Sequence, residues 1–293
     1  MLTLVLLIAA LVAGLAAGAI TLRAGRRPAP PGGHTARPAG EAIARRPHAR
    51  SVLSQRLDPE VATGLALTVA LVLIVGGGLV LAVLAYLVRG DSELVEIDRS
   101  VADWGHRHAT AFSTDVLDAI TTLGEPTVVA ILAAIVAVIE TARTRSRWVV
   151  PFLLVVVAGN GILTTTVKHL ADRVRPDVNP IAETLGPSFP SGHSSWTLAL
   201  CAATALLMSR GRSRAARAAI VGFAAAFTVT IAGSRVLLGV HWLTDVLAGL
   251  ALGAAWFAVC AVAFGGRLLR FGAPAEEAVR TAAPRPTLAR RAP

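Results

Sequence analysis

Apolar residues fall into seven long blocks separated by polar segments, and this pattern predicts membrane-spanning helices. A helix that crosses the hydrocarbon core of a bilayer needs about 20 predominantly apolar residues. The shorter blocks can gain length from flanking semipolar residues. The expected spans are 2–22, 61–88, 126–140, 148–167, 194–208, 218–232 and 242–264.

Composition agrees with this pattern. Of the 293 residues, 54% are hydrophobic and 16% are charged, and the mean hydropathy is +0.64. A soluble domain carries about 25% charged residues. The formal net charge is +10, which is compatible with a nucleic acid or a membrane surface as partner. The arginines flank the apolar blocks and form no basic stripe interleaved with aromatic residues, so we expect a membrane and no nucleic acid.

The distribution of arginine predicts the orientation of the spans, because loops rich in Lys and Arg stay on the cytoplasmic side. The segment 89–125 holds eight acidic residues and three arginines and is expected outside. With alternating spans, the N-terminus is then also outside. The segments expected inside are 23–56 with its eight arginines, 143–147, 210–217 and the tail from 267 to 293.

Two segments leave alternatives open. Segment 2–22 lacks a basic region before its apolar run, which favours an uncleaved anchor over a cleaved signal peptide. Segment 94–108 is either an interfacial helix or a solvated loop. The two cysteines, Cys201 and Cys260, lie within apolar blocks and are expected to be buried small hydrophobic residues, not a redox or zinc site.

Three polar patches adjoin spans on the side that the arginines predict to be outside. They are KHLADRVRP at 168–176, PSGH at 190–193 and SRVLLGVHWLTD at 234–245. Topology alone therefore brings them to one face of the bundle. Charged groups in or near a membrane are costly, and they are usually paired or functional.

The patches supply the chemistry of an anion site. Lys168, Arg175 and Arg235 are three cations that suit a phosphate dianion. Ser191 and Gly192 are expected at a helix N-terminus, where free backbone N–H groups and the helix dipole favour an anion. The few carboxylates nearby are Asp172, Asp177, Glu183 and Asp245.

Two histidines complete the set. His241 and Asp245 are spaced i, i+4, so we expect them to share a helix face. A carboxylate bonded to one ring nitrogen fixes the tautomer and leaves the other nitrogen as nucleophile. His193 can then donate a proton to the leaving oxygen. Two histidines and an aspartate could also bind zinc, but the three adjacent cations oppose a divalent ion.

The ordered pattern K-x6-RP, PSGH, SR-x5-H-x3-D resembles the three-part signature of the type 2 phosphatidic acid phosphatase (PAP2) superfamily. That superfamily also includes vanadium haloperoxidases and glucose-6-phosphatases. Every signature position is filled here, over a region from about residue 61 to residue 264. The haloperoxidases are soluble, so the apolar spans argue against that branch.

The resemblance implies a phosphohistidine mechanism that needs no metal and no other cofactor. His241 would be the nucleophile, Asp245 would orient it, and His193 would serve as acid and then as base. The phosphate would be held by Lys168, Arg175, Ser191, Gly192 and Arg235.

The resemblance also implies the fold and the domain organisation. The expected fold is all-α: a six-helix PAP2-type membrane core plus one N-terminal transmembrane helix. The expected divisions are an anchor at 1–22, an Arg/Pro-rich cytoplasmic linker at 23–60, the catalytic core at 61–265 and a basic disordered tail at 266–293.

The function expected from the resemblance is hydrolysis of a lipid phosphate or pyrophosphate in the cell membrane, with the site on the extracytoplasmic side. Candidate substrates are undecaprenyl pyrophosphate, phosphatidic acid and phosphatidylglycerol phosphate. The expected partners are the lipid and the bilayer, and the oligomeric state, a homo-oligomer included, is left open. Two other functions remain open: a lipid phosphotransferase, and a non-catalytic membrane transport or binding protein.

Overall fold

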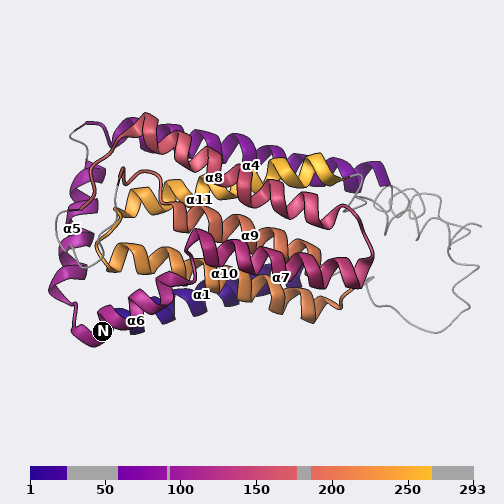
Figure 1. Cartoon of the computed structure of the whole chain (residues 1–293), viewed down its shortest axis with the longest axis horizontal. Helices are drawn as coiled ribbons and strands as arrows, with labels where there is room; N and C mark the ends of the chain where they lie inside the picture. Colours follow the sequence, from indigo (N-terminus) through magenta and orange to yellow (C-terminus); the bar gives the residue numbers. More distant parts are fainter. Residues whose placement is uncertain (25–58, 91–92, 177–185, 266–293) are drawn as a thin grey trace, which may run out of the picture.

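The computed structural model describes residues 1–24, 59–90, 93–176 and 186–265 of the chain. Within these residues the regular structure is helical. The helices are named as in Figure 1: α1 (Leu2–Ala24), α4 (Pro59–Leu87), α5 (Glu93–Arg107), α6 (Ala111–Thr122), α7 (Pro126–Thr144), α8 (Val149–Ala171), α9 (Gly192–Met208), α10 (Arg214–Leu237) and α11 (Leu243–Phe264).

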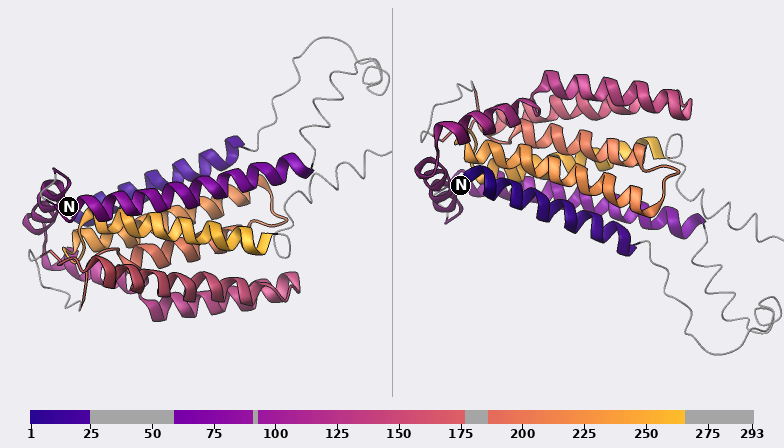
Figure 2. Two further views of the ribbon diagram at one scale, coloured as in Figure 1. Left: turned by 90° about the horizontal axis from the view of Figure 1, so that it is seen from above. Right: turned by 90° about the horizontal axis from the view of Figure 1, so that it is seen from below.

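The long helices form a bundle with α9 at its centre. Helix α9 packs against α7, α8, α10 and α11, while α4 packs on α11 and α1 packs on α10. Figure 1 shows the long helices running side by side, and the two views of Figure 2 show α1 and α4 on the outside of the bundle. Helix α8 therefore ends, and α9 and α11 begin, at the same end of the molecule.

Six of the described helices are long and apolar enough to cross a membrane, namely α1, α4, α7, α8, α10 and α11. Helix α9 has 17 residues and is about 25 Å long, which is short of a hydrocarbon core of about 30 Å. The all-α polytopic bundle is thus confirmed, whereas the count of seven spans stays a prediction.

Large apolar side chains cover the outer surface of the bundle. Val72 on α4, Val138 on α7 and Leu154 on α8 are 64%, 71% and 65% exposed. Contiguous apolar surface of this kind leads to association or aggregation in water. Exposure of the same surface to lipid tails has no such cost. A bilayer around the bundle therefore explains why these apolar side chains are not covered by other parts of the protein.

Helix α1 docks on α10 through small residues. A Cβ atom added to Gly14 would lie 2.8 Å from the carbonyl oxygen of Gly222, and one added to Gly222 would lie 2.7 Å from that of Gly14. The two backbones therefore touch, as is common for helices that pack in membranes. At the other end of this contact, the buried side chains of Leu2 and Leu6 pack in one cluster with Val240, next to His241.

We predict that Gly222→Leu forces α1 away from α10. Overpacking of a tight contact costs about 1–3 kcal/mol, so the melting temperature in detergent should fall by several degrees. Gly76→Leu on α4 is the matched control, because a Cβ at Gly76 meets no heavy atom within 4 Å. Equal melting temperatures for Gly222→Leu and the Gly76→Leu control would contradict a tightly docked α1.

Two shorter helices lie at the end of the bundle where α9 begins. Helix α5 runs across this end in Figure 1, which confirms the helical alternative for segment 94–108. Helix α6 was not expected from the sequence, because its 12 residues carry no long apolar run. It begins with a capping box in which the side chains of Thr110 and Ser113 each accept the other residue's backbone N–H, at 3.2 and 2.9 Å.

Several expectations lie outside the described residues. They concern most of the linker predicted at 23–60, the tail at 266–293, and the loop residues Asp177 and Glu183. These expectations stay predictions. The spans themselves differ by a few residues from the expected bounds, and the largest difference is in α10, which includes Arg214 and Arg217 instead of leaving them in the preceding turn.

Candidate active site

The eight residues singled out from the sequence come to one end of the bundle. Lys168 lies in the last turn of α8, and Arg175 lies in the irregular segment that follows. Ser191 caps α9, which begins with Gly192 and His193. Arg235 lies in the last turn of α10, His241 in the following turn, and Asp245 in the first turn of α11. His193 is close enough to interact electrostatically with Arg235, His241, Arg175 and Lys168.

His241 and Asp245 do not share a helix face, so this part of the sequence prediction is wrong. Helix α11 begins at Leu243 with Trp242 as its N-cap, which leaves His241 in the turn after α10. The Asp245 side chain accepts the backbone N–H of Trp242 at 3.0 Å. This contact turns the carboxylate back toward the preceding turn, and its Oδ2 lies 3.5 Å from Nδ1 of His241.

The surroundings of His241 assign its tautomer. Its Nε2 lies 3.3 Å from Nη1 of Arg175, and a guanidinium group can only donate hydrogen bonds. Nε2 must therefore present its lone pair on the side of the cations. The ring proton is then on Nδ1, which faces the Asp245 carboxylate. The Nδ1–Oδ2 contact is long for a hydrogen bond, as is common in catalytic sites without substrate.

Burial keeps this imidazole neutral. The His241 side chain is 3% exposed, and the loss of hydration lowers the pKa of its ring to about 4, although Asp245 acts in the opposite direction. A neutral ring has the free electron pair that a nucleophile needs. His241 therefore has the protonation state for nucleophilic attack at neutral pH.

This pKa predicts a pH dependence of stability. The folded-state value of about 4 lies below the unfolded value of about 6.5, so the unfolded chain binds more protons between these pH values. The contribution of His241 to stability is fully present above about pH 6.5 and is lost as the pH falls toward 4. The melting temperature should therefore fall more steeply over this range in the wild type than in His241→Asn. Parallel pH profiles would contradict the lowered pKa.

The three cations are free of carboxylate partners among the described residues. Lys168 donates to the carbonyl of Pro187, and Arg175 donates to the carbonyls of Val240 and Gly186 at 2.8 and 3.0 Å. Arg235 is buried, with Nη1 bonded to Thr121 Oγ1 at 2.9 Å, and its Nε has no hydrogen-bond partner in the part of the chain that the structure describes. Their positive charge remains available to an anion, and phosphate oxygens are the acceptors that Arg and Lys bind best.

The start of α9 is fixed to α11 by backbone contacts. The Ser191 N–H donates to the carbonyl of Asp245 at 2.9 Å. A Cβ on Gly249 would lie only 2.4 Å from the Ser191 carbonyl oxygen, so only glycine permits this approach. The Ser191 hydroxyl accepts from Ser194 Oγ at 3.1 Å, and its own hydrogen can still be donated. The helix N-terminus expected at Ser191 and Gly192 is therefore present and rigidly held.

Sequence reasoning missed a buried ionic network behind Asp245. Arg173 donates to Asp245 Oδ1 at 2.6 Å and to Asp98 Oδ2 at 2.8 Å. Both carboxylates are buried. Asp98 also accepts the backbone N–H of Thr244 at 2.9 Å and the hydroxyl of the same residue. Arg173 thus fixes the Asp245 carboxylate and joins α5 to the first turn of α11.

Part of this network has a signal in the sequence. Arg173 lies within the first polar patch, two residues before Arg175. Arg173 could therefore have been named as a further cation of that patch. Asp98 has no such signal, because its partner is 75 residues away in the chain.

We predict that Arg173→Met lowers kcat by about 10- to 100-fold, as is typical when the group that orients a ligand or catalytic side chain is removed. It leaves two buried carboxylates without their cation, so the melting temperature should fall as well. Arg173→Lys restores one charge and should recover part of kcat with little change in KM. A loss seen only in KM would instead place Arg173 among the residues that bind substrate.

Residues 148–268 match the PAP2 superfamily. Lipid A 1-phosphatase of Rhizobium johnstonii is 35% identical over 136 residues, which are 41% of this chain and 52% of that protein, so the chain spans about half the length of this relative. Decaprenylphosphoryl-5-phosphoribose phosphatase of Mycobacterium tuberculosis is 33% identical over 153 residues, which are 49% of this chain and 76% of that protein.

A solved structure has the same fold. The transmembrane PAP2 type phosphatidylglycerolphosphate phosphatase from Bacillus subtilis aligns with a TM-score of 0.63 at 26% identity, over 68% of this chain and 99% of that one. The three-part signature is complete, its residues meet in one site, and one relative is matched over three quarters of its length. The chain therefore belongs to the PAP2 superfamily.

Proposed function

We propose that this protein is a metal-independent membrane phosphatase that hydrolyses a lipid phosphate or pyrophosphate through a phosphohistidine intermediate. One observation carries the proposal: the neutral ring of His241 directs Nε2 toward Arg175 and carries its proton on the side of Asp245. Asp245, His241 and Arg175 are thus neighbours in space, in the order of orienting group, nucleophile and a cation that can bind the phosphate.

In the first half of the reaction, Nε2 of His241 attacks phosphorus and the bond from phosphorus to the lipid oxygen breaks. Lys168, Arg175 and Arg235 hold the other phosphate oxygens and stabilise the charge that develops there. The negative charge of the bound phosphate favours the protonated form of His193, which then gives its proton to the leaving lipid oxygen. Asp245 stabilises the imidazolium that forms when the ring becomes phosphorylated.

In the second half, water cleaves the phosphorus–nitrogen bond. The neutral His193 left by the first step takes a proton from the water as it attacks phosphorus. The electron pair of the broken bond returns to Nε2 of His241, and inorganic phosphate leaves. Both histidines end in their starting protonation states, so the cycle needs no further reactant.

The relatives and the surface of the bundle support a lipid as the substrate class. Each relative described above is named for a phosphatase whose substrate is a lipid, with a phosphate on lipid A, on a decaprenyl-linked ribose or on phosphatidylglycerol. The apolar outer surface of this bundle suits a substrate that stays in the bilayer. Undecaprenyl pyrophosphate, phosphatidic acid and phosphatidylglycerol phosphate are therefore the first candidates.

We place the site on the extracytoplasmic side of the plasma membrane. The end of the bundle opposite the site carries the arginines that end α7 and that precede or begin α10, in segments 143–147 and 210–217. Arginines this close to membrane spans stay on the cytoplasmic side. The other end of the bundle, with Lys168 and His241, then faces outward.

The proposal is tested by phosphate release from the three candidate lipids, with purified protein in detergent and EDTA present. We expect release that persists in EDTA and that vanadate inhibits, since vanadate adopts the five-coordinate geometry of phosphorus under attack. Release abolished by EDTA would contradict a metal-free mechanism. Release that requires an added alcohol, with the phosphate appearing on that alcohol, would show a phosphotransferase instead of a hydrolase.

A further inference from the structure

One stripe of residues on α1 faces the bundle. It consists of every fourth residue, and its side chains become smaller along the chain: Leu2, Leu6, Ala10, Gly14 and Gly18. Residues four apart lie on one face of a helix, and Leu2 and Leu6 are 0% and 3% exposed. Leu4 and Leu7, which lie off the stripe, are 60% and 57% exposed. A membrane span needs only apolar residues, so this order of sizes reflects what α1 packs against.

The stripe fixes α1 against α10 in one register. The two backbones touch where Gly14 meets Gly222. Closer to the end of α10, a Cβ atom on Gly233 would lie 2.5 Å from Cδ1 of Leu6, so the leucine fills the space beside this glycine. The pairs run in opposite directions, so α1 is antiparallel to α10 and its first turns lie at the active-site end. Figure 1 shows the N-terminus beside α6 at this end.

The two leucines of the stripe reach the turn that carries His241. They pack in one buried cluster with three further side chains, Leu117 of α6 and Leu238 and Val240 of the turn. Val240 directly precedes His241 in the chain. The first turns of α1 therefore support the turn that carries the proposed nucleophile.

The backbone of Val240 is hydrogen-bonded to two arginines of the site. Its N–H donates to the carbonyl of Arg235 at 3.2 Å, and its carbonyl accepts from Nη1 of Arg175 at 2.8 Å. The same Nη1 lies 3.3 Å from Nε2 of His241. A displacement of Val240 would therefore move His241 relative to the cations that are expected to bind the phosphate.

Lipid tails cannot replace this support. If α1 were absent, tails would cover Leu238 and Val240, and the apolar environment of these side chains would change little. Fluid tails, however, give a side chain no fixed position, whereas close packing holds it in one arrangement. The contribution of α1 at this end is therefore the position of the turn.

We propose that Leu2 and Leu6 are positioning residues for the reaction, which hold the turn at 238–241 so that Nε2 of His241 points at the phosphate. This inference rests on the proposed function, in which His241 attacks phosphorus. It also changes the division of the chain, because α1 then belongs to the catalytic unit and is not a separable anchor.

Leu6→Ala in the full chain tests the contact with the turn. The measurement is the rate constant of a single turnover, with the enzyme saturating and in excess over dioleoyl phosphatidic acid. We expect it to fall about tenfold, since a misplacement of about 1 Å can cost about 100-fold in rate. The steady-state KM should change little, because Lys168 and Arg235 still bind the phosphate.

Two control variants separate position from general damage. Leu6→Met keeps nearly the same volume and should retain most of the wild-type rate. Leu7→Ala removes an equal number of atoms from the exposed side of the same helix and should match the wild type. A Leu6→Ala rate equal to that of Leu7→Ala, or a loss confined to KM, would overturn the proposal. Failure of the proposed function is distinguishable, because the wild type then releases no phosphate.

Gly222→Leu tests the same support from a distance. Gly222 lies about 16 Å from Gly233 along α10, so the added side chain moves α1 without contact with the site. We expect kcat to fall as in Leu6→Ala, while Gly76→Leu keeps the wild-type value. The double variant with Leu6→Ala should lose little more, because both changes act through one displacement. Losses that multiply would show two independent effects and would contradict the shared role.

The intact mass of the active enzyme gives a test without substitutions. If α1 supports the catalytic turn, the protein purified from its own membrane and active in phosphate release retains residues 1–24. A fully active protein from which these residues have been removed would overturn the proposal, because the turn would then need no contact from α1.

Discussion

His241→Ala is expected to lower phosphate release from lipid substrates by about 10⁴-fold or more, because covalent catalysis is lost with its nucleophile. Nε2 of this ring is the atom that faces Arg175, and no other described histidine has both a carboxylate and a site cation as neighbours. The measurement is a time course of phosphate release, with the phosphoenzyme trapped by acid quench from radiolabelled substrate. Label should accumulate on the wild type and be absent from the variant.

His169→Ala is the matched control for this experiment. His169 is adjacent to Lys168 but its side chain is exposed, and it occupies no position of the three-part signature. We expect wild-type release and wild-type labelling from this variant. Near-normal rates in His241→Ala, with the control also normal, would show that another group attacks phosphorus.

Asp245→Asn is expected to be the second most damaging substitution, with a loss of kcat of about 10³- to 10⁴-fold by analogy with triad carboxylates that hold a catalytic histidine. The amide is nearly the same size, so the contacts with Trp242 and Arg173 can be kept in part. It carries no charge to stabilise the imidazolium, and its NH2 group cannot accept the Nδ1 proton. The ring is then free to adopt the other tautomer, in which Nε2 has no lone pair to offer.

The measurement for Asp245→Asn is the split between kcat and KM, with Asp172→Asn as control. Asp172 ends α8 in the left-handed conformation at φ 42°, which asparagine also adopts readily, and its side chain is exposed. We expect kcat to fall in Asp245→Asn while KM changes little, because Lys168, Arg175 and Arg235 still bind the phosphate. A rise in KM alone would assign Asp245 to substrate binding.

The buried network of Arg173 and Asp98 links these results to the architecture. Asp245 is held on one side by Trp242 and on the other by Arg173, which is also bound by Asp98 of α5. Helix α5, which crosses the end of the bundle, therefore helps to orient His241, the proposed nucleophile. Two carboxylates share one guanidinium, and the remaining negative charge favours the cationic ring that forms on phosphorylation.

Local pattern in the sequence was sufficient for the long helices and for the eight residues that meet at one end of the bundle. Apolar blocks predicted the long helices because a membrane span is defined by its own composition, whatever it packs against. The alternation of arginine-rich loops predicted that Lys168, Ser191 and His241 lie at one end of the bundle, because the chain reverses its direction between successive spans. The residue types in the three patches predicted an anion site, because charge and hydrogen-bonding capacity are properties of the side chains themselves.

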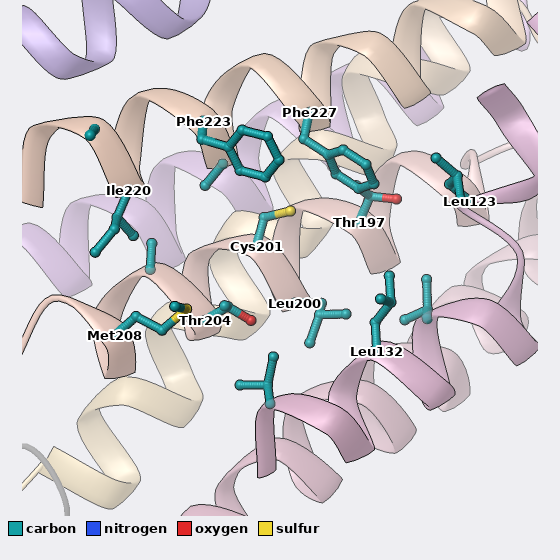
Figure 3. A pocket seen from close by; sticks show the side chains of 15 residues that line it. Leu123, Leu132, Thr197, Leu200, Cys201, Thr204, Met208, Ile220, Phe223 and Phe227 are labelled. Carbon is teal, nitrogen blue, oxygen red and sulfur yellow. The ribbon is translucent and has the colours of Figure 1, made fainter. Parts of the chain in front are cut away.

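Only the tertiary structure decided how these groups meet. The sequence spacing suggested that His241 and Asp245 share a helix, but α11 begins at Leu243 and the carboxylate turns back to reach the ring. Asp98 was not predictable as a partner of Arg173, since a contact across 75 residues depends on how α5 lies across the bundle. An apolar groove between α7 and α10 (Figure 3) exists because both helices pack on α9 and leave a space between them. Such a space is a property of packing that no single helix encodes.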